Sequence, residues 1–61
     1  MSLEEKAIKL FEELKAKAIE LKALDNAGQA VMGDLLQIAV LDSKLQVLAE
    51  LLEVPYEYKK L

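Results

Sequence analysis

The sequence predicts an all-α protein, a three-helix bundle formed by a single domain of 61 residues. Apolar side chains recur at three- and four-residue spacing along most of the chain, which is the period of an amphipathic helix. Two Ser-x-x-Glu or Ser-x-x-Gln sequences mark helix starts, and helix breakers are few, with 2 glycines and 1 proline. We expect helices over about 3–24, 27–41 and 44–53, followed by an irregular tail over 54–61.

The first helix should begin after Ser2, whose hydroxyl can cap it in a capping box with Glu5. One side of this helix is apolar and faces the core, while lysine and glutamate fill the opposite side. The apolar stripe comprises Leu3, Ala7, Leu10, Phe11, Leu14, Ala18 and Leu21. The turn follows at 25–28, where Asn26 can adopt the left-handed backbone or cap the next helix. A connection of about two or three residues makes the second helix antiparallel to the first.

The second helix carries more apolar side chains than one packing face can use. We expect Leu10, Leu14 and Leu21 to be covered by a stripe of this helix that consists of Val31, Leu35, Ile38 and Ala39, with Met32 at its edge. Leu36 and Val40 then widen the apolar arc to about 200°, whereas a single packing face needs roughly 100°. Something else must cover the remainder.

Residues 42–44 separate the predicted second and third helices, because Ser43 and Gln46 repeat the capping-box pattern. The alternative is one helix over about 27–53, since neither glycine nor proline enforces a stop at residues 42–44. This would give a helical hairpin that buries its surplus stripe by dimerising into a four-helix bundle. Pro55 ends the pattern in both cases, because it lacks an N–H and disfavours helix at Val54.

The composition excludes most chemistry. The chain has neither histidine nor cysteine, and its serines lie at predicted helix caps, so we expect no catalytic residue, no cofactor and no metal ligand. A net charge of −3 without arginine offers no basic patch to nucleic acid. No apolar run approaches the roughly 20 residues of a membrane span, and no signal peptide is visible. We therefore expect a soluble protein, cytoplasmic by default, with no membrane partner.

The distribution of charge and the position of one glycine instead predict a protein-binding module. Residues 3–25 contain 11 charged side chains, whereas residues 26–49 contain only Asp34, Asp42 and Lys44. Gly33 costs about 1 kcal/mol in a helix relative to alanine, which indicates close packing against either the first helix or a partner. On the last helix, either Leu45, Leu48 and Leu52 or Val47, Leu51 and Val54 face the core.

The predicted interface extends from the second helix into the tail. Tyrosine is enriched at interfaces, so the tail tyrosines are candidates, although packing of the tail on its own chain is the alternative. We expect a target protein to contact Gln29, Gly33, Leu36, Gln37, Val40, Val47, Leu51, Val54, Tyr56 and Tyr58.

The chain as a whole resembles computationally designed helical miniprotein binders. The features that carry this resemblance are Met1-Ser2 before the helix cap, the opening L-E-E-K-A-I-K-L-F-E-E-L-K-A-K, and an alphabet rich in Glu, Lys, Leu and Ala without Cys, His or Trp. Such proteins are three-helix scaffolds that present a rigid helix face to a target. The resemblance implies binding of a target protein without catalysis, and a self-associating homodimer with no external target is the alternative.

Overall fold

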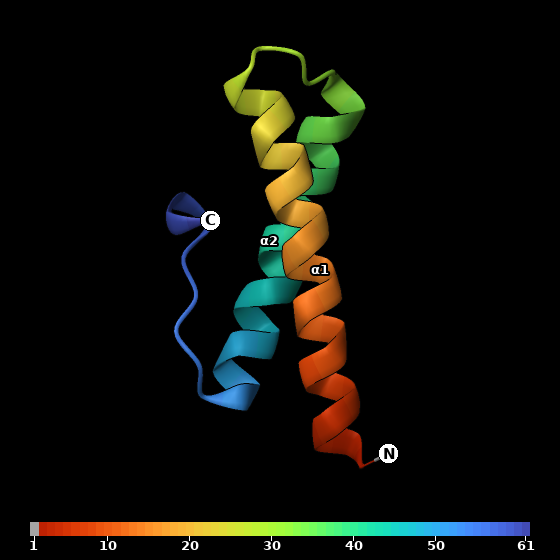
Figure 1. The fold of residues 1–61 in the computed structure, drawn as a ribbon, viewed down its shortest axis with the longest axis vertical. Coiled ribbons are helices and arrows are strands. Elements are labelled where there is room, and N and C mark those ends of the chain that lie inside the picture. The colour runs from red at the N-terminus through yellow and green to blue at the C-terminus, as the bar shows by residue number, and fades with distance from the viewer. Residues whose placement is uncertain (1) are drawn as a thin grey trace.

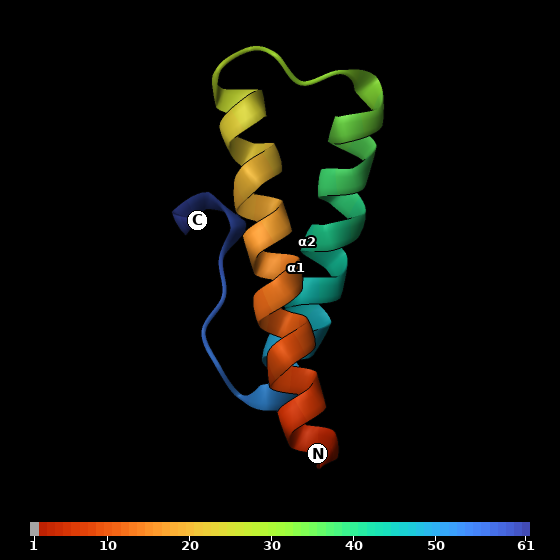
Figure 2. The ribbon, with the colours of Figure 1, turned by 45° about the vertical axis from the view of Figure 1, so that its right-hand side comes forward.

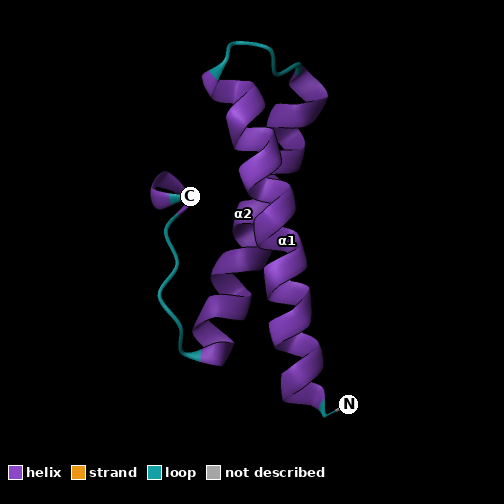
Figure 3. Ribbon diagram, viewed as in Figure 1, coloured by secondary structure: helices purple, strands orange, loops and turns teal. Residues whose placement is uncertain are grey.

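The fold is a helical hairpin, as shown by a computed structural model that describes residues 2–61 (Figure 1). Its elements are α1 (Leu3–Asn26), α2 (Met32–Leu52) and a short 3-10 helix η1 (Tyr58–Lys60) (Figure 3). The expected all-α class is confirmed. The three-helix bundle is wrong, because residues 32–52 form one helix, and the alternative hairpin is the compatible architecture.

The ends of α1 follow the local sequence signals. Ser2 is the N-cap, and its Oγ accepts a hydrogen bond from the Glu5 N–H at 3.1 Å. At the other end, the N–H of Gln29 donates to the carbonyl of Leu24 at 2.9 Å, and Gly28 has a φ of 71°. This is the Schellman arrangement, in which a left-handed residue after the helix satisfies its last carbonyls. The left-handed residue is therefore Gly28 and not Asn26, and α1 ends two residues later than expected.

The second helix starts five residues later than predicted. Its N-cap is Val31, whose N–H donates to Asp34 Oδ2 at 3.1 Å. The acidic side chain of Asp34 thus takes the place of the expected Asn26 cap, and it also complements the positive end of the helix dipole. The loop over 27–31 is consequently longer than the expected connection of about two or three residues.

The predicted break at 42–44 does not occur. Leu41 and Leu45 are both buried on the side that faces α1, one helical turn apart, so packing continues across the polar segment. Ser43 is exposed and caps nothing. Asp42 instead accepts hydrogen bonds from Gln46 Nε2 at 3.1 Å and from the Tyr56 hydroxyl at 2.7 Å.

The core lies between the two helices and is small. Its buried members are Phe11, Ala18 and Leu21 on α1 and Leu41, Leu45 and Ala49 on α2. Leu14, Leu24, Ile38, Leu48 and Leu52 pack around them, half-buried. On the last helical turns the core side is therefore the one with Leu45, Leu48 and Leu52.

Much of the predicted core stripe is wrong. Val31 is 64% exposed and Leu35 is 42% exposed, and Met32 and Ala39 are exposed as well. On α1 the two leucines at positions 3 and 10 are also exposed. The reason is that α2 is apolar in nearly every direction, so its spacing alone does not select the face that packs on α1.

The tail over 54–61 turns back beside the hairpin. Glu53, with φ 57° and ψ 41°, ends α2 in the left-handed conformation, and the Val54 N–H bonds to the Ala49 carbonyl at 3.0 Å. The tail then runs along one side of the hairpin toward the loop end (Figures 1 and 2). Its conformation is largely irregular, as expected, apart from η1.

Candidate protein-binding surface

An apolar stripe on α2 points away from the core. At 100° per residue, Gly33, Leu36, Val40, Val47 and Leu51 fall within an arc of about 60°, centred about 150° from the buried residues of the same helix. Leu36 is 63% exposed and Leu51 is 74% exposed, and the two valines are more than half exposed. The side of a surface helix that points away from the core usually carries charged residues. On α2 this side is apolar instead, and its side chains are left exposed.

A groove between the helices extends the stripe onto α1. Two adjoining hollows share Leu10 and Leu48, and most of the side chains that line them are apolar. From α1 the walls are Leu3, Ala7, Leu10 and Leu14, and from α2 they include Val47, Leu48, Leu51 and Leu52. We call the five stripe residues together with Leu3 and Leu10 the open face.

Charge is sparse around the open face. Lys44 borders the middle of the stripe and lines the groove, and Glu4 and Lys6 lie at the groove's end near the start of α1. The surface therefore offers apolar contact with a few charges at its edge, which is the usual composition of a protein interface.

The opposite side of the hairpin is covered by the tail. On that side Lys15 and Ile19 of α1 line a crevice with Pro55, Tyr56 and Leu61. The ring of Tyr56 meets that of Phe11 edge-to-face, with 6.2 Å between centroids. The tail thus packs on the hairpin through an aromatic contact and a crevice on α1.

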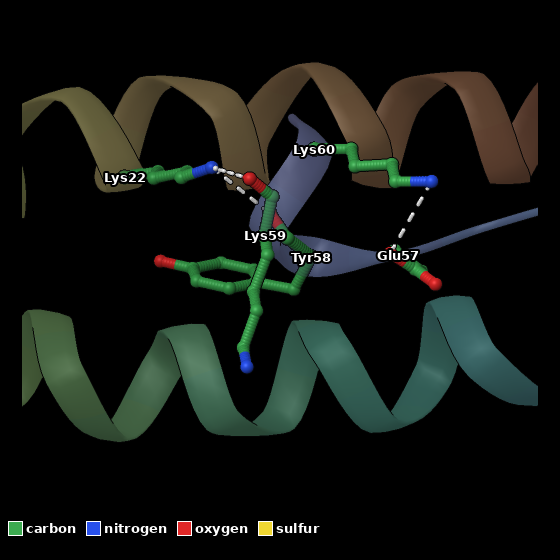
Figure 4. A network of polar contacts seen from close by, with 5 residues as sticks. All are labelled: Lys22, Glu57, Tyr58, Lys59 and Lys60. Atoms are coloured by element: carbon green, nitrogen blue, oxygen red, sulfur yellow. Dashed lines mark hydrogen bonds and ion pairs between the residues drawn. The ribbon is translucent and has the colours of Figure 1, made fainter.

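Lys22 holds the end of the tail. Its ammonium group donates to the carbonyls of Tyr58 and Lys59, each at 3.0 Å (Figure 4). It also donates to the carbonyl of Leu61 at 3.0 Å and lies 5.3 Å from the centroid of the Tyr58 ring. These carbonyls lie within η1 or directly after it, and that of Tyr58 also accepts a hydrogen bond from the Leu61 N–H at 3.1 Å. One cation therefore caps η1 and fixes it against α1.

Both tyrosines of the tail have raised pKa values. Burial is the main cause for the Tyr56 hydroxyl, whose pKa is raised well above its ordinary value, and the hydrogen bond to Asp42 adds to it. Burial is also the first cause of the raised pKa of Tyr58, followed by the nearby charges of Asp25 and Asp42. Each environment favours the neutral phenol, which suits side chains that pack within their own chain.

The predicted interface residues fall into two groups. Gly33, Leu36, Val40, Val47 and Leu51 lie together on the open face, and Gln37 is exposed on the same helix. The others are elsewhere: Gln29 is in the loop, Val54 begins the tail, and Tyr56 and Tyr58 are half-buried against the chain's own helices. The structure therefore brings six of the ten onto one helix.

Gly33 does not pack against α1. A Cβ added to it would meet no atom within 4 Å, so the interpretation that it packs on the first helix is wrong. The residues that the sequence missed are Leu3 and Leu10, which were assigned to the core. A signal for Leu10 exists, because it lies 100° around the helix from its neighbour Phe11, which puts the two at opposite edges of a single packing face.

Comparison with protein families, with curated proteins and with solved structures finds no match to this chain.

The chemistry of the site is that of apolar contact. Within residues 2–61, no group of three acidic side chains is placed to hold a metal ion. No helix in the same part of the chain is sufficiently long and apolar to cross a bilayer. When another apolar surface packs on the open face, apolar area is removed from water, and this stabilises the contact.

Proposed function

We propose that this chain is a protein-binding module that presents the open face to a helix of another polypeptide. The observation that carries the proposal is the exposed stripe on α2, because four of its apolar side chains, Leu36, Val40, Val47 and Leu51, are more than half exposed on one side of a single helix. A helix laid in a groove between two helices is a recurring mode of recognition, read out by side chains at three- and four-residue spacing. The likeness of the opening sequence to designed miniprotein binders supports the same function.

The way the two sides of the hairpin differ also supports the proposal. The tail side has paired polar groups, with Asp42 bonded to Tyr56 and Lys22 bonded to three carbonyls. The open face carries exposed leucine and valine side chains instead. A surface that served only to face water would carry charge here, as the outer side of α1 does.

The proposal is tested with amphipathic helical peptides selected from a displayed library for binding to the immobilised chain. Leu36→Asp should abolish peptide binding, because it buries a carboxylate in an apolar contact. The same change should alter the free energy of unfolding of the dilute chain by less than about 1 kcal/mol, since Leu36 is exposed. Ala16→Asp, at an exposed position of α1, is the matched control and should bind as wild type.

If the selected peptides bind Leu36→Asp and the wild type equally well, the open face is not the interface. If Leu36→Asp unfolds the dilute chain, Leu36 belongs to the core and the proposal fails.

A second candidate function is structural, in which two copies associate through the open face and bind nothing else. The elongated shape favours it, with extents of 39 × 20 × 14 Å and a radius of gyration of 12.2 Å. A compact chain of this length would have a radius of about 10.5 Å.

A further inference from the structure

We infer that the partner of the open face is a second copy of this chain, with the two α2 helices antiparallel and Leu51 of each copy over Gly33 of the other. The inference rests on the proposed function, because it names the protein that the open face binds. It also fixes which residues meet across the interface.

The first support is the accessible surface, which exceeds that of a compact chain. The surface is 4586 Å² for a mass of 6.8 kDa, whereas a compact monomer of this mass has about 3,950 Å². The excess of about 600 Å² is close to the roughly 800 Å² that each partner buries in a standard stable interface. One neighbour of similar size would therefore bring the chain to the surface expected for its mass.

The second support is that the stripe is complementary to itself when reversed. Gly33 and Leu51 lie nine residues before and nine residues after Asp42, and Leu36 and Val47 lie six before and five after it. A twofold axis that passes between the two α2 helices, perpendicular to them and level with Asp42 along the chain, therefore places Gly33 opposite Leu51 and Leu36 close to Val47. The same surface is then used by both copies, as a closed twofold dimer requires.

The sizes of the opposed side chains also match. Leu51 is the most exposed apolar side chain of α2, at 74%, and a Cβ added to Gly33 would have no atom within 4 Å. A large side chain opposite a small one lets two helices interdigitate, and glycine allows the backbones to approach closely. This pairing accounts for a glycine that packs against nothing in its own chain.

Lys44 lies near the proposed axis, so its substitution should change the stability of the dimer. It borders the stripe at the position opposite Val40 of the second copy, so its alkyl stem can cover apolar surface while the ammonium group reaches water. The two ammonium groups repel each other, so Lys44→Leu should tighten the dimer. A foreign helix with an acidic residue opposite Lys44 would instead be weakened by the same substitution.

Disulfide crosslinking tests the register directly, because the wild-type sequence contains no cysteine. Gly33→Cys and Leu51→Cys chains are purified separately, mixed and oxidised. The antiparallel register should give mainly the mixed disulfide, since positions 33 and 51 of different copies adjoin. Two copies of position 33 would be about 27 Å apart along the helices, far beyond the roughly 7 Å that a disulfide spans between Cα atoms. Equal amounts of mixed and like disulfides overturn the register.

Sedimentation equilibrium from micromolar to millimolar concentration tests the dimer itself. We expect a monomer–dimer equilibrium for the wild type, with a dissociation constant at least about tenfold weaker for Leu51→Asp and for the bulky Gly33→Leu. Circular dichroism of the dilute variants shows whether each remains helical. Ala16→Asp is again the control and should dimerise as the wild type does.

The outcomes separate the inference from the proposed function. A wild type that stays monomeric throughout this range overturns the second copy as partner, while loss of peptide binding in Leu36→Asp would still uphold the open face. A dimer that Leu51→Asp and Gly33→Leu leave unchanged places self-association elsewhere and also overturns the inference.

Discussion

The two glycines illustrate how one residue type has opposite roles at two positions. Gly28 has a φ of 71°, where a side chain is strained, so Gly28→Ala should destabilise the fold by about 1–2 kcal/mol. Gly33 is helical with open space around it, so Gly33→Ala should stabilise the monomer by up to about 1 kcal/mol. Urea unfolding of dilute samples measures both. Destabilisation by Gly33→Ala would mean that its Cβ meets an atom of its own chain.

Tyr56 should make the stability of the hairpin depend on alkaline pH. Its pKa in the folded chain is raised, first by burial and then by Asp42, above the value of about 10 for a solvated tyrosine. The unfolded chain therefore loses this proton first, so the stabilisation is complete below about pH 10 and declines as the pH rises above that value.

Thermal unfolding across this pH range checks the effect of Tyr56. Tyr56→Phe keeps the ring contact with Phe11 but lacks the titrating group, so its midpoint should fall less steeply with pH than that of the wild type. Tyr58→Phe removes the other phenol with a raised pKa, so it measures the part of the pH dependence that comes from Tyr58. Equal slopes for wild type and Tyr56→Phe would contradict the assignment.

At the scale of the element, α2 has one side that stabilises the fold and another that faces water. Leu45 is completely buried, so Leu45→Ala should cost about 2–5 kcal/mol in unfolding free energy. Leu35 is 42% exposed and lies outside the core cluster, so Leu35→Ala should cost about 1 kcal/mol or less. Denaturant titration of the two variants at the same protein concentration provides the comparison. Similar losses for both would contradict the assignment of the core face.

The packing faces of the two helices could not be predicted equally well from the sequence. In α1, charged residues occupy the exposed side, so the spacing correctly predicted the core position of Phe11, Leu14, Ala18 and Leu21. Leu3 and Leu10 of the same predicted stripe are exposed, and their assignment to the core was wrong. In α2, apolar residues occur all around the helix, so the contact with α1 selects the face, and spacing chose Leu35 wrongly. The break at Ser43 was wrong for a related reason, since a capping sequence is also compatible with the middle of a helix when its flanking leucines are buried.

The candidate site was predictable in part. The excess of apolar residues on α2 pointed to Leu36 and Val40, and they are exposed as expected. The place of Tyr56 was not predictable, because it depends on a hydrogen bond to Asp42, 14 residues earlier, and on a ring contact with Phe11 of the other helix. Local spacing carries no information on contacts between segments so far apart in the sequence.

At the scale of the whole molecule, a hairpin of this length has a small interior. Among residues 2–61, six side chains are buried, three from each helix. Chains of about 60 residues bury only about 60% of the surface that the unfolded chain exposes, so a single core of this size is marginal. Association through the open face would add buried area that two helices alone do not provide.

If copies of the chain associate through the open face, the tail also limits how many of them can join. A hairpin of two helices has two broad sides, and with both apolar and uncovered it could recruit neighbours on each and grow into an open chain of subunits. Because Lys22 and Tyr56 fix the tail over one side, a single side remains. An interface that uses the same patch on both copies then closes at two subunits and leaves nothing to propagate. The last eight residues thus favour a complex of defined stoichiometry over a fibre.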